Sequence, residues 1–97
     1  MTIHVYVQNG SKEDLIAALE FELIRLLEPV FDKFKSLTGV RITEYDDVRL
    51  YPDHVKLLLD LLRKSAGQLL EVGEHKKFVL GLQGALTMNS CVMFVGE

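Results

Sequence analysis

A leucine-rich segment in the middle of the chain, residues 52–64, constrains the fold more than any other part of the sequence. Apolar side chains recur there at i, i+3, i+4 and i+7, which places them on one face of an α-helix. The residues with this spacing are Val55, Leu58, Leu59 and Leu62. Pro52 suits the first helical position, where its missing N–H costs nothing, and Gly67 suits a helix stop. The pattern predicts a helix with a buried leucine face, which Leu57 and Leu61 widen.

An acidic and aromatic stretch, residues 44–53, leads into this helix. Its carboxylates and rings belong to Glu44, Tyr45, Asp46, Asp47, Tyr51 and Asp53. One interpretation is a solvated turn, because Asp side chains bond to nearby backbone groups and favour turns. The other is a recognition edge, because tyrosines offer rigid contact area and carboxylates can meet a basic partner. The sequence leaves both interpretations open.

Three short segments have the pattern of β-strands. Residues 2–8 alternate between apolar and polar side chains, which is the period of a strand with one buried face. Residues 40–44 alternate again, with Val40 and Ile42 expected to point inward. Residues 91–95 are continuously apolar, which is typical of a strand buried on both faces. These patterns predict that the two ends of the chain meet in one sheet.

A long helix is expected between the first two strands. Ser11 is a preferred N-cap residue, and Asp14 stands three residues later, close to a capping box. An apolar stripe at helical spacing then continues to Phe34. We expect Pro29 to kink this helix or divide it into two, because proline deletes a backbone hydrogen bond. Gly39 is the expected C-terminal stop.

A third helix is expected over residues 74–86, and Asn89-Ser90 would end it. Gly81 and Gly84 leave a bare flank there, which favours close approach of a neighbouring element. Residues 67–73 fit either a continuation of the leucine helix or a connection. The resulting order is β-α-β-α-α-β. It predicts an α/β domain of the α+β type over residues 1–97, with a small sheet of about three strands and packed helices.

Composition narrows the class of protein. The chain has 97 residues, of which 48% are hydrophobic and 26% charged, an ordinary globular balance. Its net charge of −3 argues against a nucleic-acid-binding face, which is usually basic. Cys91 is the single cysteine, so no intramolecular disulfide can form, which fits a reducing compartment. There is no signal-peptide pattern and no apolar run of about 18 residues, so we expect a cytoplasmic protein that does not span a membrane.

The sequence contains no catalytic signature. His4, His54 and His75 are scattered, and there is no glycine-rich phosphate loop. Asp53 and His54 are adjacent, but neighbours on a helix point about 100° apart and so do not form a dyad. The acidic turn could offer oxygen ligands to a hard metal, yet it lacks the ligand number that such sites need. We therefore expect a protein that is not an enzyme and holds no cofactor or metal.

The segment from Ile42 to Leu62 combines a strand, the acidic turn, the step Leu50-Tyr51-Pro52-Asp53 and the leucine helix. With the apolar end at residues 92–97, it resembles small bacterial immunity proteins of polymorphic-toxin and contact-dependent growth inhibition systems. The resemblance covers residues 40–97 and implies a non-catalytic cytoplasmic inhibitor that binds a cognate toxin domain. Such toxins are often nucleases with basic clefts, where an acidic edge could take the place of a phosphate backbone.

Charge, rings and expected exposure select the candidate partner-binding residues. They are Glu44, Tyr45, Asp46, Asp47, Tyr51 and Asp53. A second hypothesis is a small structural or regulatory subunit that forms a homodimer through Leu57, Leu61 and Leu69. A third, an enzyme of unrecognised type, would need two titratable groups that converge in a pocket, and the sequence indicates no such pair.

Overall fold

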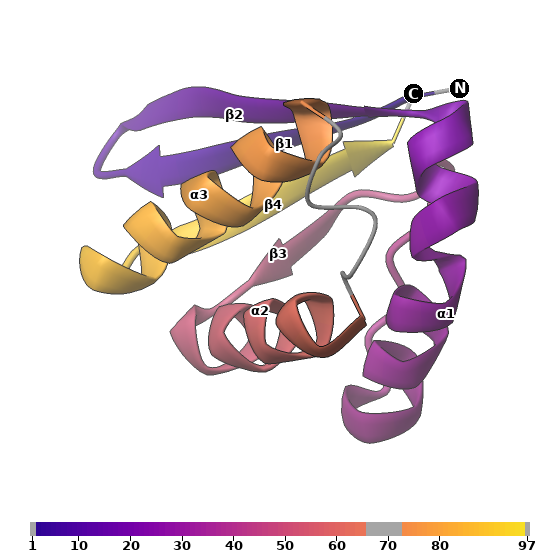
Figure 1. Cartoon of the computed structure of the whole chain (residues 1–97). Coiled ribbons are helices and arrows are strands. Elements are labelled where there is room, and N and C mark those ends of the chain that lie inside the picture. The colour runs from indigo at the N-terminus through magenta and orange to yellow at the C-terminus, as the bar shows by residue number, and fades with distance from the viewer. Residues whose placement is uncertain (1, 66–72, 97) are drawn as a thin grey trace.

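A four-stranded antiparallel sheet in the order β2-β1-β4-β3 carries the fold (Figure 1). The computed structural model describes residues 2–65 and 73–96. The elements in chain order are β1 (Thr2–Asn9), β2 (Lys12–Glu20), α1 (Phe21–Thr38), β3 (Val48–Leu50), α2 (Pro52–Ser65), α3 (Gly73–Thr87) and β4 (Cys91–Gly96). Figure 1 shows the three helices together on one side of the sheet. The α+β class is as expected, with four strands instead of three.

The first strand is as expected, but the helix predicted from Ser11 is wrong at its start. After a turn at Gly10, which has a φ of 67°, residues 12–20 form β2 and pair with β1. A β-bulge explains the error. Tyr6 pairs with Leu15 and Val5 pairs with Ala17, so Ile16 is an extra residue on β2. The bulge breaks strict alternation and leaves adjacent apolar residues that mimic helical spacing.

The helix that does form, α1, begins at Phe21. It continues through Pro29 as one element, so the division into two helices is wrong. Gly39 ends it as expected. Its φ is 77°, and its N–H donates to the carbonyl of Lys35 at 2.7 Å. Glycine is the residue that adopts this left-handed backbone conformation at the lowest cost.

The strand predicted at residues 40–44 is also wrong, because the strand of this region is β3, at Val48–Leu50. Residues 40–43 instead connect α1 to a turn. Ile42 is buried and Val40 packs against the core, so their alternation reflects a loop that lies on the core. A local hydrogen bond stabilises the start of this loop, because the backbone N–H of Val40 donates to the hydroxyl of Thr38 at 3.0 Å.

The leucine helix is confirmed as α2, which begins at Pro52. Its expected face is buried: Val55, Leu58, Leu59 and Leu62 are each at most 2% exposed. The prediction for residues 67–72, with the stop at Gly67, lies outside the described residues. The third helix is confirmed as α3, which begins at Gly73.

Close approach to α3 is confirmed at Gly81, because a Cβ there would lie 2.7 Å from the Cδ1 of Ile16. Gly84 has open space around the same position, so the prediction is wrong there. The extra residue of the bulge in β2, Ile16, is thus the one that contacts α3 at Gly81.

The last strand pairs with β1 and β3, so the two ends of the chain do meet in one sheet. The expected burial of β4 on both faces is wrong. Val92 and Phe94 are fully buried beneath the helices, and Phe94 packs edge-on against Phe78 of α3 at 5.9 Å. Met93 and Val95 point to the other face and are partly exposed, because no described helix covers it (Figure 1).

Candidate functional site

The six candidate residues of the acidic–aromatic segment, residues 44–53, lie at the two ends of β3. This strand forms one edge of the sheet. Glu44, Tyr45, Asp46 and Asp47 make the turn before it. Tyr51 directly precedes α2, and Asp53 lies in the first turn of that helix. Roughly 13 Å of extended chain separates the two groups. The structure therefore places them along one border of the sheet without closing them into a single cluster.

Five of the six side chains are exposed, and Glu44 is half-buried. The tyrosines are the notable ones, since Tyr45 is 74% exposed and Tyr51 is 58% exposed. The side chains of Asp46 and Asp53 make no hydrogen bond or ion pair with any residue that the structure describes. Their carboxylates are therefore available to a partner.

Asp47 differs from the other carboxylates because it holds the turn in place. Its Oδ1 accepts a hydrogen bond from the backbone N–H of Gly96, at the end of β4, at 3.3 Å. A Cβ on Gly96 would overlap the carbonyl of Glu44, so the turn passes directly over a glycine. The N–H of Tyr45 donates to the hydroxyl of Thr43 at 3.2 Å. Asp47 thus supports the turn through a distant strand, and not through the local backbone bond expected of a solvated turn.

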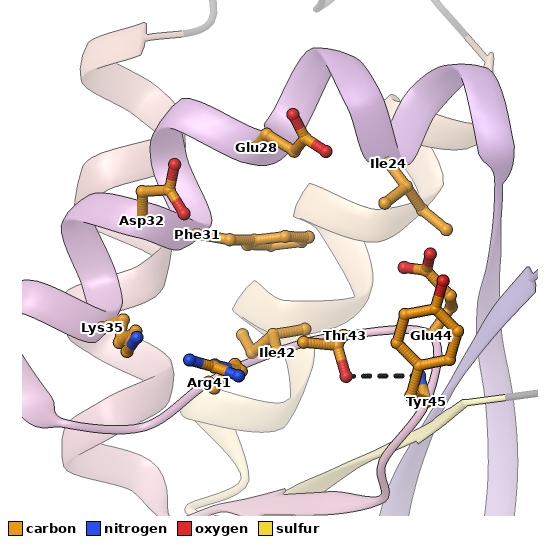
Figure 2. Close-up of a pocket in the computed structure, with 10 residues that line it drawn as sticks. All are labelled: Ile24, Glu28, Phe31, Asp32, Lys35, Arg41, Ile42, Thr43, Glu44 and Tyr45. Carbon is orange, nitrogen blue, oxygen red and sulfur yellow. Dashed lines mark hydrogen bonds between the residues drawn. The ribbon is translucent and has the colours of Figure 1, made fainter.

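A pocket of about 490 Å³ opens between α1 and residues 41–45 (Figure 2). It is lined by Ile24, Glu28, Phe31, Asp32, Lys35, Arg41, Ile42, Thr43, Glu44 and Tyr45. Three of these side chains are buried and apolar, namely Ile24, Phe31 and Ile42. The pocket therefore joins the acidic–aromatic segment, through Glu44 and Tyr45, to a charged face of α1.

The charged residues of this pocket do not neutralise one another at contact distance. Within residues 2–65 and 73–96, the one ion pair closer than 4.0 Å joins Lys77 to Glu74, both on α3. The sequence did not reveal the wall of the pocket that α1 provides. The spacing of Glu28 and Asp32, four residues apart, put them on one helix face, but no pattern indicated which segment would face them.

His75 is a second residue whose environment the sequence did not reveal. It lies in α3 and is fully buried, and neither ring nitrogen has a hydrogen-bond partner among the described residues. Burial lowers its pKa, so the ring is neutral at pH 7. His54, by contrast, lies half-buried beside the ring of Phe34 on α1, at 5.9 Å between ring centres. Neither histidine lines the pocket.

In the part of the chain that the structure describes, no three His, Cys, Asp or Glu side chains are grouped to hold a metal ion. The leucine surface proposed for a homodimer is largely used within the monomer, because Leu57 and Leu61 pack against the core. Leu69 lies outside the described residues. No described helix is long and apolar enough to cross a membrane.

Comparisons with protein-family models, with curated proteins and with solved structures found no match for the chain. The resemblance of residues 40–97 to immunity proteins therefore stays a prediction. A function for the protein has to rest on the exposed side chains around β3 and on the pocket beside them.

Proposed function

We propose that this protein is a non-catalytic binding protein that neutralises a basic toxin domain in the cytoplasm. The acidic–aromatic segment would form its binding surface. The observation that carries the proposal is the exposure of Tyr45 and Tyr51, at 74% and 58%, within a segment of exposed carboxylates.

Exposed tyrosines of this kind favour a protein partner. A ring left in water forgoes the free energy of burial, and tyrosine is enriched among the residues that dominate protein interfaces. Tyr51 precedes the first residue of α2, and its carbonyl accepts the N–H of Val55 at 3.0 Å. Its backbone is thus held by a helix anchored in the core, so little order would be lost on binding.

The charges favour a basic partner. Asp46 and Asp53 are exposed and unpaired among the described residues, and the chain as a whole carries a charge of −3. A surface of one sign accelerates encounter with a surface of the other sign. A nuclease toxin with a basic cleft, which the resemblance implies, fits this description.

The test is a pull-down with the tagged protein against the product of the neighbouring gene, followed by an activity assay of that product. We expect the wild type to silence the activity at a near one-to-one ratio. Tyr51→Ala and Asp46→Lys should each weaken binding by about tenfold or more. Leu37→Ala and Asp14→Lys are matched controls, because they change an exposed apolar and an exposed acidic residue elsewhere.

Two results would contradict the proposal. One is a neighbouring product that has no toxic activity and does not bind. The other is binding that the control substitutions weaken as much as the substitutions in the segment do, since this would place the contact elsewhere.

A further inference from the structure

We infer that the pocket between α1 and residues 41–45 receives one basic and one acidic side chain from the same segment of a protein partner. We call it the two-ended pocket. The inference rests on the proposed function and deepens it, because it names the recessed contact of that interface and the charge order of the partner. Electrostatic attraction to the acidic–aromatic segment alone would bring a basic partner close without orienting it.

The size and floor of the pocket fit inserted side chains. Its volume of about 490 Å³ lies in the range of sites that hold small ligands, roughly 300–1,000 Å³. Phe31 and Ile42 form an apolar base, each 5% exposed. The aliphatic stems of long charged side chains can lie on such a base while their charged heads reach the walls.

The charges of the pocket are unevenly distributed. Figure 2 shows Lys35 and Arg41 together at one end, with the single carboxylate of Asp32 on α1 above them, and Glu44 beside Tyr45 at the other end. Glu28 projects from α1 over the interval between them. A basic side chain is therefore favoured near Glu28 and Glu44, and an acidic one near Lys35 and Arg41.

These charged groups are open to a partner. Glu28, Lys35 and Arg41 are exposed, and none of them forms an ion pair with another described residue within 4.0 Å. A partner that supplied opposite charges would satisfy them without first breaking an internal pair. The carboxylates disfavour a nucleic-acid backbone, whose phosphates would meet repulsion from Glu28 and Glu44.

The pocket is continuous with the proposed interface. Glu44 and Tyr45 belong to both, and Tyr45 stands at the rim with 74% of its surface exposed. Binding energy at protein interfaces concentrates where side chains enter pockets surrounded by contacts that exclude water. A partner lying on the acidic–aromatic segment would cover this rim, which favours a protein segment over a free small molecule.

The experiment changes the charge at both ends without changing the net charge. The double variant Glu28→Lys/Arg41→Glu, the exchanged variant, leaves Lys35 beside a new carboxylate and Glu44 near a new ammonium group. It therefore removes the difference in sign between the two ends, while attraction over long distances stays the same. Both positions are exposed, and thermal unfolding should show a variant as stable as the wild type. Should the double variant fail to fold, Glu28→Gln and Arg41→Gln remove each charge singly and answer the same question.

The probe is a random peptide library displayed on phage and selected on the full-length wild-type chain. We expect the enriched peptides to carry a basic and an acidic residue at a fixed spacing. They should bind the exchanged variant about tenfold more weakly or worse. On that variant, which has lost the difference in sign between the ends, the same peptides with their basic and acidic residues exchanged should bind as well as the original peptides.

The outcomes separate this inference from the proposed function, because Asp46→Lys and Tyr51→Ala lie outside the pocket. Peptides that bind the wild type and the exchanged variant equally overturn the two-ended pocket. If those peptides still lose binding on Asp46→Lys, the proposed surface stands without the pocket. Sensitivity to the exchanged variant alone supports the pocket and overturns the proposed surface. A selection that enriches no peptide overturns the pocket as well.

Discussion

The two ends of β3 carry the same residue types but are held in different ways. At one end, the turn at residues 44–47 depends on contacts with Gly96, through the carboxylate of Asp47 and the close passage of Glu44. At the other end, Tyr51 precedes a helix whose leucine face is buried, and Asp53 lies in the first turn of that helix. The turn is therefore held by contacts at the end of β4, whereas the start of α2 is held by the packing of that helix in the core.

The number of carboxylates in a segment therefore does not show which of them stabilise the turn and which are available to a partner. Asp47 accepts a backbone hydrogen bond, whereas Asp53 lies in the first turn of α2 and has no partner among the described residues. The core-held end should behave as a rigid part of a binding surface. The turn should be the part that mutation can displace.

The largest expected effect comes from adding one methyl group at Gly96. Gly96→Ala forces the turn off the end of β4, and overpacking of this kind costs about 1–3 kcal/mol of unfolding free energy. Urea unfolding measures the loss, and NMR shifts should change most at residues 44–47. Gly84→Ala is the control, because its Cβ has open space and alanine favours the helix. Equal stability of the two variants would show that Gly96 does not hold the turn.

Lowering the pH should reduce the unfolding free energy of the whole domain through His75. This effect is not specific to either end of β3. Burial lowers the pKa of His75 in the folded state. Below pH 6.5 the imidazole is therefore protonated in the unfolded chain while it is still neutral in the folded chain. Stability then falls with pH, by at most about 1.4 kcal/mol per pH unit, until the folded ring itself is protonated.

His75→Leu should flatten this pH dependence, which urea unfolding between pH 7 and pH 5 would measure. His54→Leu is the control, because His54 is only half-buried. If both variants keep the slope of the wild type, the titration belongs to other groups. The comparison of the two ends of β3 is therefore best made at pH 7 or above, where His75 is neutral.

Much of the fold follows from local patterns that tertiary structure did not override. The leucine helix was predictable because its apolar spacing, its proline start and its buried face agree. The stop at Gly39 was predictable because few other residues adopt a positive φ at low cost. The alternation in β1 and the short β-branched and aromatic run in β4 also indicated strands, although β4 is buried on one face only.

The errors arose where a pattern had two physical explanations. In β2, the cap-like Ser11 and the adjacent Leu15 and Ile16 favoured a helix, and pairing with β1 outweighed them. At residues 40–43, alternation came from a loop that buries Ile42. The pocket was beyond prediction because it requires α1 and the following loop to face each other, a contact that no local signal encodes.

A smaller effect separates two neighbouring carboxylates within the turn. Asp47→Ala removes the acceptor for the N–H of Gly96, which should cost about 0.5–1.5 kcal/mol. Asp46→Ala should change stability by less than about 0.5 kcal/mol, because Asp46 is exposed and bonds to no described residue. Urea unfolding of both variants measures the difference. Equal losses would mean that the bond from Gly96 does not hold the turn.

The smallest effect on stability is expected for the tyrosines, and this makes them the sharpest probes of binding. Tyr51→Ala and Tyr45→Ala should each change the unfolding free energy by less than about 0.5 kcal/mol, because both rings are exposed. Tyr6→Ala should lower the unfolding free energy more than either of these, because the ring of Tyr6 is partly buried on the face of β1 that no described helix covers. A large loss of stability in Tyr51→Ala would mean that the ring supports the fold, and it could then not be treated as a surface kept for a partner.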